Sequence, residues 1–318
     1  MKTEKGKKSP SLHWADVEES GAYWGLKFLA LIYRLAGRRV CLVFMFPVLL
    51  FFYLILSSAR RSINQFNKYV SDMQGHQKTG FWQGFPNFLA FGAAALDKLA
   101  AWDGDIRKDK IVFPGKMKTL FELDVDKNGA VLFVSHLGNV EVMRAIAALT
   151  EPRPITVLVH TKHAQRFNRL MARFNPASTL KLIEVTEMGP DVAVYLKNCV
   201  DRGEWVVIAA DRPPVGDRSN IIWIPFLGHP APFALGPYVL AHVLEKPVFQ
   251  VACVRVGDKF VVEFAKLTDR MMLRRKDRHK SAEKWATQYA AWLEMLALKY
   301  PEQWFNFFSF WAASEDEH

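Results

Sequence analysis

The second half of the chain alternates short apolar runs with segments of helical periodicity. Four apolar runs predict buried strands, at 130–134 (AVLFV), 155–159 (ITVLV), 180–185 (LKLIEV) and 205–210 (WVVIAA). Between these runs the apolar residues recur at helical spacing, at 139–149, 164–174 and 191–200. Short buried strands separated by helices are typical of βαβ units. We therefore predict an α/β fold with a mainly parallel central sheet flanked by helices.

The same pattern predicts elements on either side of this region. Residues 62–128 predict helices and loops, with an apolar helix at 88–99. Residues 247–255 and 259–264 predict a closing hairpin, because the glycine and aspartate between them favour a tight turn. A long C-terminal helix is expected at 282–300.

An uncharged apolar segment lies near the N-terminus, at 40–56 (VCLVFMFPVLLFFYLIL). With the three small residues that follow it, it approaches the about 20 residues that a transmembrane helix needs. It starts too late, and is flanked by too much arginine, for a cleaved signal peptide. Pro47 leaves both a kinked spanning helix and a shallow re-entrant segment open. We predict a membrane anchor rather than a buried core helix, and three parts: tail and anchor at 1–61, a helical lead-in at 62–128, and an α/β domain at 129–318.

Composition and charge support a membrane partner. The chain has 24 Phe and 10 Trp among 318 residues, and aromatic rings favour the membrane interface. The formal net charge of +10 attracts polyanions, such as nucleic acid, an anionic membrane or an acidic carrier protein. The aromatic content favours the membrane over nucleic acid. The three cysteines lie far apart without a CxxC, so we expect buried thiols and no disulfide framework.

The first candidate for chemistry is His136, directly after the first predicted strand, with Glu141 five residues later. Functional residues of an α/β sheet gather past the C-terminal ends of its strands. Gly138 and Asn139 favour a tight turn and a helix N-cap, which places Glu141 in the first helical turn. A carboxylate on one ring nitrogen leaves the other free as a base for a substrate hydroxyl. A locally satisfied histidine, with a glutamate that suits the helix dipole, is the alternative.

Two further stretches follow the fourth predicted strand. Asp211 and Arg212 stand directly at its end, where an arginine can bind phosphate bidentately or form a solvated ion pair. The stretch 224–228 (IPFLG) contains Phe226 and Gly228, and precedes a predicted helix start at Pro237. Its backbone N–H groups can meet an anion or a carbonyl oxygen, or the stretch is a connector.

Other chemistries lack support. His160 and His163 have no third ligand at suitable spacing, so we predict no metal site. Ser135 has no G-x-S-x-G context, and the chain has no P-loop or G-x-G-x-x-G. We therefore predict no cofactor.

Taken together, these motifs resemble a known family. SHLGNVE at 135–141 is similar to the H-x-x-x-x-(D/E) motif of the glycerolipid acyltransferase superfamily. The residues Asp211-Arg212, IPFLGHPA at 224–231 and PEQW at 301–304 resemble motifs of the bacterial lipid A biosynthesis acyltransferases, the lauroyl and myristoyl transferases. The resemblance covers roughly residues 20–312 of the chain.

The resemblance implies a function and a set of site residues. The donor would be an acyl thioester, on acyl carrier protein or CoA, and the acceptor a hydroxyl of a membrane lipid or glycolipid. The place would be the cytoplasmic face of the bacterial inner membrane. His136 would be the general base with Glu141 as its partner. Substrate-binding residues would be Gly138, Asn139, Arg173, Asp211, Arg212, Phe226 and Gly228.

The chain departs from the lipid A enzymes after PEQW. It continues FNFFSFW, as in a sub-branch with a W-F-N-F-x-x-F-W ending, where a His-Arg-Arg type element is usual. We interpret the aromatic ending as suited to a less charged acceptor than lipid A, or to the membrane interface. Two alternatives stay open: a non-enzymatic membrane protein that binds anionic lipid through its basic segment at 270–280, and a lipid hydrolase with the same His/Glu pair.

Overall fold

The computed structural model describes residues 14–76, 80–114, 129–150, 154–159, 181–184, 189–213 and 218–311. The chain contacts divide it into two units, Met1–Met45 and Phe46–His318. In the first unit the described residues are helical, whereas the second contains every described strand. The predicted helix at 164–174, with His160 and His163, lies outside the described residues.

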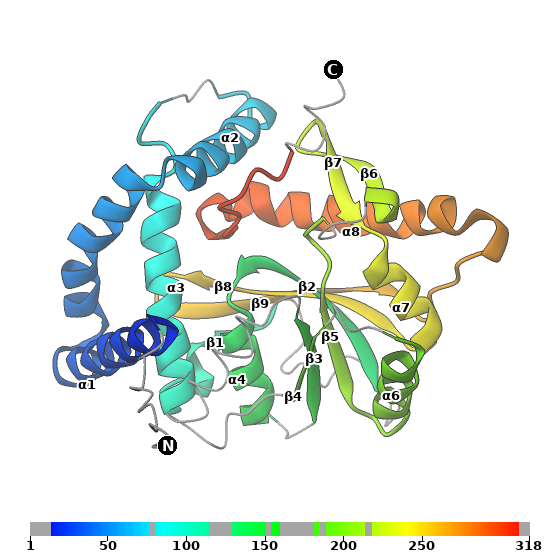
Figure 1. Ribbon diagram of the computed structural model, residues 1–318, viewed down its shortest axis with the longest axis horizontal. Helices are drawn as coiled ribbons and strands as arrows, with labels where there is room; N and C mark the ends of the chain where they lie inside the picture. Colours follow the sequence, from blue (N-terminus) through cyan, green and yellow to red (C-terminus); the bar gives the residue numbers. More distant parts are fainter. Residues whose placement is uncertain are drawn as a thin grey trace, which may run out of the picture. The chain divides into compact units, whose positions relative to one another are not determined.

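The N-terminal apolar segment is helical, as its composition predicts. Helix α1 (Trp14–Ile55) has one non-helical residue, Gly37 at φ 74°, and its backbone remains helical through Pro47 (Figure 1). Among the described residues, Leu31–Ile55 is the one stretch long and apolar enough to cross a membrane, and few of its side chains are buried. The predicted segment at 40–56 therefore forms an apolar helix that can span a bilayer.

A seven-stranded sheet lies in the second unit, in the order β1-β9-β8-β2-β5-β3-β4 (Figure 1). Its strands are β1 (Ile111–Val112), β2 (Ala130–Gly138), β3 (Ile155–Val159), β4 (Lys181–Glu184), β5 (Trp205–Ala209), β8 (Val248–Val256) and β9 (Lys259–Thr268). Neighbouring strands pair in parallel except β8 and β9, which form the predicted hairpin. The predicted α/β fold with a mainly parallel sheet is confirmed.

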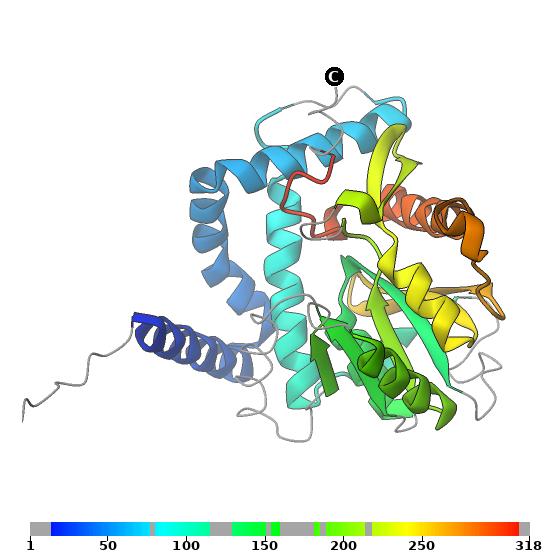
Figure 2. The same ribbon diagram turned by 45° about the vertical axis from the view of Figure 1, so that its right-hand side comes forward.

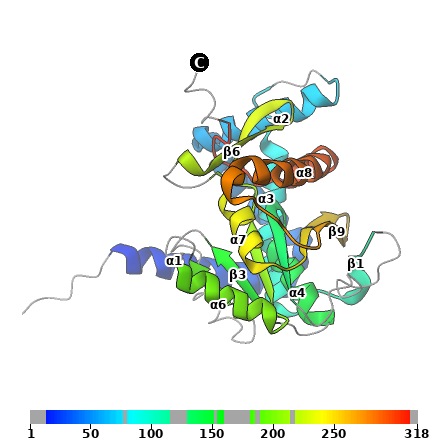
Figure 3. The ribbon, with the colours of Figure 1, turned by 90° about the vertical axis from the view of Figure 1, so that its right-hand side faces the viewer.

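Helices cover both faces of this sheet. They are α4 (Val140–Thr150), α6 (Pro190–Asp201), α7 (Gly236–Leu244) and α8 (Arg278–Lys299), with α2 (Ser57–Met73) and α3 (Phe85–Asp103) preceding the sheet in sequence. The connection from β2 to β3 crosses the sheet in one direction and that from β4 to β5 in the other. Since such crossovers are right-handed, α4 and α6 lie on opposite faces (Figure 3). Helix α3 packs against α4, and α7 packs against α6.

A second hairpin occupies the glycine- and proline-rich stretch for which a connector was one of the two alternatives. Strands β6 (Ile221–Phe226) and β7 (His229–Ala234) pair antiparallel, with Leu227 and Gly228 at φ 51° and 76° in the turn. Alternate residues of β6 are buried, which is the period of a strand with one face on the core. Prolines are tolerated because this ladder has two strands and therefore only edges.

The C-terminal residues 304–311, which we call the C-terminal strap, belong largely to the core. Figure 2 shows the strap, in red, between α2 and α3 on one side and the β6–β7 hairpin on the other. Trp304, Phe310 and Trp311 are almost fully buried, and the Trp304 ring lies 4.7 Å from that of Phe66 and 5.3 Å from that of Phe226. The interpretation of this ending as a membrane or acceptor surface is wrong for these three residues, because their rings pack against α2 and the hairpin.

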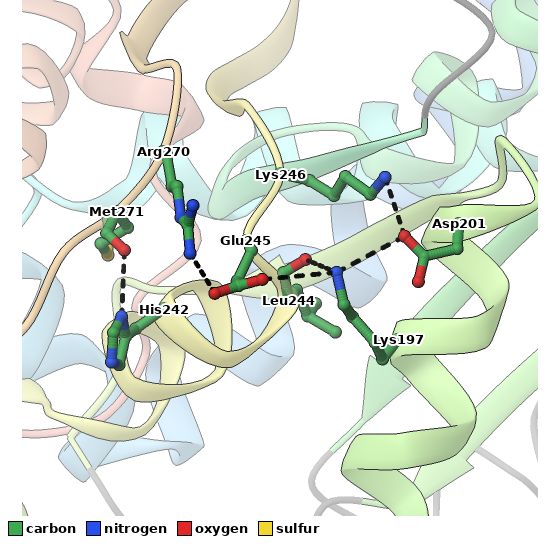
Figure 4. Close-up of polar contacts among 8 residues, drawn as sticks. All are labelled: Lys197, Asp201, His242, Leu244, Glu245, Lys246, Arg270 and Met271. Carbon is green, nitrogen blue, oxygen red and sulfur yellow. Dashed lines mark hydrogen bonds and ion pairs between the residues drawn. The ribbon is translucent and has the colours of Figure 1, made fainter.

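Polar contacts join α6, α7 and the segment after β9 at the surface (Figure 4). The Lys197 ammonium lies 3.4 Å from Asp201 and donates to the carbonyl of Leu244 at 3.1 Å. Lys246 also pairs with Asp201, at 2.8 Å. Exposed pairs of this kind contribute about 0–1 kcal/mol each, so the network aligns two helices more than it stabilises them.

The three cysteines are free and buried, as expected. Burial raises the pKa of the Cys253 thiol, and the charge of Asp97 raises it further. Because the thiolate is the reactive form, we predict that iodoacetamide at about pH 8.5 leaves Cys253 unmodified in the folded protein. The native protein is given an iodoacetamide pulse that is long enough to alkylate the urea-unfolded chain fully. Peptide mass spectrometry then measures the modification of Cys253. Rapid labelling of Cys253 in the native protein would contradict the burial.

Candidate active site

The candidate site lies where β2 ends. Residues Val131–Val134 pair with β5 on one side and β8 on the other, which fixes the strand in the middle of the sheet. The register with β8 shifts between Val134 and Gly138, and His136 lies in this irregular part of the strand. The side chain of His136 is 35% exposed. The imidazole is therefore partly covered by the protein and partly accessible.

Asp211 holds the buried edge of this imidazole. It lies two residues after the end of β5, and its carboxylate Oδ1 lies 2.8 Å from His136 Nδ1. The other oxygen, Oδ2, accepts the backbone N–H of His136 at 2.7 Å and the indole N–H of Trp304 at 3.1 Å. The side chain of Asp211 is 1% exposed. Both oxygens thus have donors, and the ring and backbone of the histidine are fixed by a single carboxylate.

The neighbours of Asp211 favour its ionised form. Burial alone raises the pKa of Asp211, but the nearby imidazole and the donors on His136 and Trp304 outweigh burial and lower the pKa below its usual value. An anionic acceptor at Nδ1 favours the tautomer with its proton on Nδ1. The other ring nitrogen, Nε2, then carries a free lone pair. This arrangement is that of a general base with its orienting carboxylate.

The sequence hypothesis gave the orienting role to Glu141, and the structure gives the Nδ1 contact to Asp211 instead. Glu141 lies in the first turn of α4, as predicted. Its charge acts on Lys98 of α3, where burial lowers the lysine pKa and Glu141 opposes that decrease. Asp211 reaches His136 because of the register of the sheet. Pairing of β2 with β5 brings the ends of both strands together, and Ala210 N–H donates to Val134 O at 3.0 Å.

Gly138 and Asn139 make the turn that separates His136 from α4. Gly138 has φ 80°, and its backbone lies against that of Cys253. Asn139 is buried; its Oδ1 accepts the N–H of Val142 at 3.4 Å and its amide donates to Ala94 O at 2.9 Å. The predicted N-cap is confirmed. These contacts show that both residues shape the turn. Their role in substrate binding stays a prediction.

Gly138→Ala is expected to destabilise the fold strongly. A Cβ there would lie 2.1 Å from the carbonyl oxygen of Cys253, a backbone atom of the central sheet, and φ is positive. We expect a loss of more than about 2 kcal/mol of unfolding free energy. Denaturant unfolding in detergent measures the loss. Gly236→Ala is the matched control, because nothing lies within 4 Å of the position that its new methyl group would take. Equal stability of the two variants would contradict the close approach.

The other predicted substrate-binding residues have different surroundings. Arg212 is exposed, with its guanidinium 5.1 Å from the ring centre of Phe308. Phe226 is fully buried against Trp304, and therefore is part of the wall behind Asp211. Gly228 lies in the turn of the β6–β7 hairpin. Arg173 lies outside the described residues.

Two buried tyrosines behind Asp211 were not predicted from the sequence. Tyr289 of α8 donates to the carbonyl of Val134 at 2.9 Å, and Tyr238 of α7 packs edge-on against Phe133. Burial, followed by the charge of Asp211, raises the pKa of both phenols. Both therefore stay neutral beside the carboxylate. Each stands on an otherwise apolar helix face, so periodicity predicts burial but not the contact with the site. Within the described ranges, no three His, Cys, Asp or Glu side chains gather in a way that suits a metal ion.

Fold and site together define an α/β protein with a histidine–aspartate pair at the ends of two adjacent parallel strands. In open α/β sheets, ligands bind just outside the carboxyl ends of the strands. The sequence profile described as bacterial lipid A biosynthesis acyltransferase matches residues 96–312, so the chain belongs to this family. No individual curated protein matches it significantly. The membership confirms the family resemblance and supports acyl transfer to a lipid.

Proposed function

We propose that this protein transfers a fatty acyl chain from an acyl thioester to a hydroxyl of a membrane glycolipid, with His136 as general base and Asp211 as its orienting carboxylate. The single observation that carries the proposal is the 2.8 Å contact between Asp211 Oδ1 and His136 Nδ1, on a half-exposed imidazole in a chain of this family. The contact leaves Nε2 to receive a proton from a substrate.

In the proposed reaction, Nε2 removes the acceptor hydroxyl proton while the hydroxyl oxygen attacks the thioester carbonyl. A C–O bond forms and a tetrahedral oxyanion results. The oxyanion collapses with cleavage of the C–S bond, and the imidazolium returns its proton to the departing thiolate. Asp211 stabilises the transient imidazolium, because its buried charge lies directly beside Nδ1. The base restores itself, so each turnover consumes only donor and acceptor.

The family and the N-terminal apolar helix support a proposal for the donor, the acceptor and the location. We propose acyl carrier protein as donor, with CoA as the alternative carrier, and the cytoplasmic face of the inner membrane as the location. The apolar helix Leu31–Ile55 supports the membrane location. The chain has no basic residue at 305–311, directly after PEQW. The missing positive charge favours an acceptor with less phosphate than lipid A.

A lipid hydrolase remains the second candidate, because the same dyad can activate water. The observation that favours it is the partial exposure of the His136 side chain, which allows water as well as a lipid hydroxyl to approach the imidazole. Acyl transfer requires the lipid hydroxyl to be the nucleophile that reaches Nε2.

Purified full-length protein in detergent separates these candidates. We would supply acyl carrier protein or CoA bearing the same acyl chain, with and without a bacterial membrane lipid extract, and follow lipids and free fatty acid by mass spectrometry. The proposal expects a lipid heavier by one acyl chain, formed only with the extract. Free fatty acid released from the extract when no thioester is supplied would instead identify a lipid hydrolase. Unchanged thioester together with an unchanged lipid extract would refute both.

A further inference from the structure

Trp304 is the third partner of the dyad. Its indole N–H donates to Asp211 Oδ2 at 3.1 Å, and its ring has no exposed surface. Its backbone forms a bridge with Leu137, and the next residue, Phe305, donates its N–H to the carbonyl of His136 at 3.0 Å. The strap therefore contacts the catalytic turn through the backbone of the histidine and through the carboxylate that orients it.

The position of the indole is set by contacts on all sides. Gln303 pairs with the backbone of Arg255 in β8, accepting its N–H and donating to its carbonyl, both at 2.8 Å. The indole ring packs against Phe66 of α2 and against Phe226 of the hairpin. The donor is thus held by a core strand on one side and by packed aromatic rings on the other.

An indole suits this task because of its chemistry. It has a donor and no acceptor, and it stays uncharged over the whole pH range in which proteins are folded. The indole can therefore only donate to the carboxylate. It adds no charge that would compete with the imidazole for Asp211. Asp211 Oδ2 already accepts the His136 backbone N–H, so the second donor fixes the carboxylate plane. The fixed plane keeps Oδ1 directed at Nδ1.

We propose that Trp304 is a positioning residue, which holds Asp211 against His136 and couples the C-terminal strap to the catalytic histidine. The expected effect on catalysis rests on the proposed function, whereas the contact between Trp304 and Asp211 does not. Other charged or titratable groups that act on Asp211 are Arg212, Tyr238 and Tyr289, and none of them changes in the test below.

The test replaces Trp304 by phenylalanine, and separately by benzothienylalanine, which keeps the shape of the indole but has sulfur in place of the N–H. Trp311→Phe is the matched control, because this tryptophan is equally buried and packs on the same Phe226 ring. Two readouts are followed in the full-length protein. One is kcat and KM for acyl transfer, and the other is the pH dependence of diethylpyrocarbonate modification at His136, resolved by peptide mass spectrometry.

We expect both Trp304 variants to lower kcat by about tenfold, with KM nearly unchanged. The modification midpoint of His136 should move to higher pH by about half a unit, because a carboxylate with one donor fewer favours the imidazolium more strongly. Trp311→Phe should change neither. Wild-type kcat and midpoint in the benzothienylalanine protein would overturn the proposal, even if phenylalanine disturbs folding. If the wild-type protein transfers no acyl group but the Trp304 variants still shift the modification midpoint of His136, the proposed function is refuted and the positioning role is kept.

Discussion

His136→Ala is expected to lower acyl transfer by about 10²–10⁴-fold, with KM for both substrates nearly unchanged. The reason is that the imidazole, whose side chain is 35% exposed, provides the lone pair that accepts the hydroxyl proton. Initial rates with the preferred thioester and a lipid extract measure the effect.

His136→Asn is the companion variant. An asparagine amide can still donate to Asp211 from near the Nδ1 position, but it has no base to accept a proton. We therefore expect it to be as inactive as the alanine variant and more stable, since the buried carboxylate keeps a partner. Wild-type turnover in either variant would show that the histidine is not the base.

Asp211→Asn is expected to reduce kcat by about 10³–10⁴-fold while the fold is kept. The amide oxygen would accept the N–H groups of His136 and Trp304, so its NH₂ group would face Nδ1. The imidazole would then carry its proton on Nε2, which is the wrong tautomer for a base. The measurement is kcat and kcat/KM, with circular dichroism to confirm folding.

Glu141→Gln provides the comparison, because it is the other carboxylate that the sequence offers for the same role. It lies in the first turn of α4, and its charge acts on Lys98. We expect this variant to lose less activity than Asp211→Asn. A larger loss in Glu141→Gln, with Asp211→Asn close to wild type, would return the orienting role to Glu141.

The fold could be predicted because buried parallel strands are continuous apolar runs, as at 130–134 and 205–210, separated by helices with clear periodicity. The β6–β7 hairpin was missed because Pro225, Pro230 and Pro232 suggest a loop. Its strand character lies in the alternate burial of β6, which depends on the core that α8 and the strap provide. The two-residue strand β1 is too short to leave a pattern.

The candidate site was predicted in part. The strand-end rule pointed to His136 and Asp211 separately, because each follows a buried run. Their pairing depends on β2 and β5 being neighbours, and strand order is a long-range property that local spacing does not contain. Spacing therefore favoured the nearby Glu141. In the same way, PEQW marked the family, but the indole contact with Asp211 joins residues 93 positions apart.

The most direct test of the proposed acyl transfer is the lipid profile of cells that contain the wild-type protein, the His136→Ala variant or neither. High-resolution mass spectrometry of total lipid extracts would be compared at equal protein levels in the membrane fraction. We predict one glycolipid that is heavier by a fatty acyl chain only with the wild-type protein, and its lighter precursor in the other two. Identical lipid profiles in wild-type and His136→Ala cells would contradict this function.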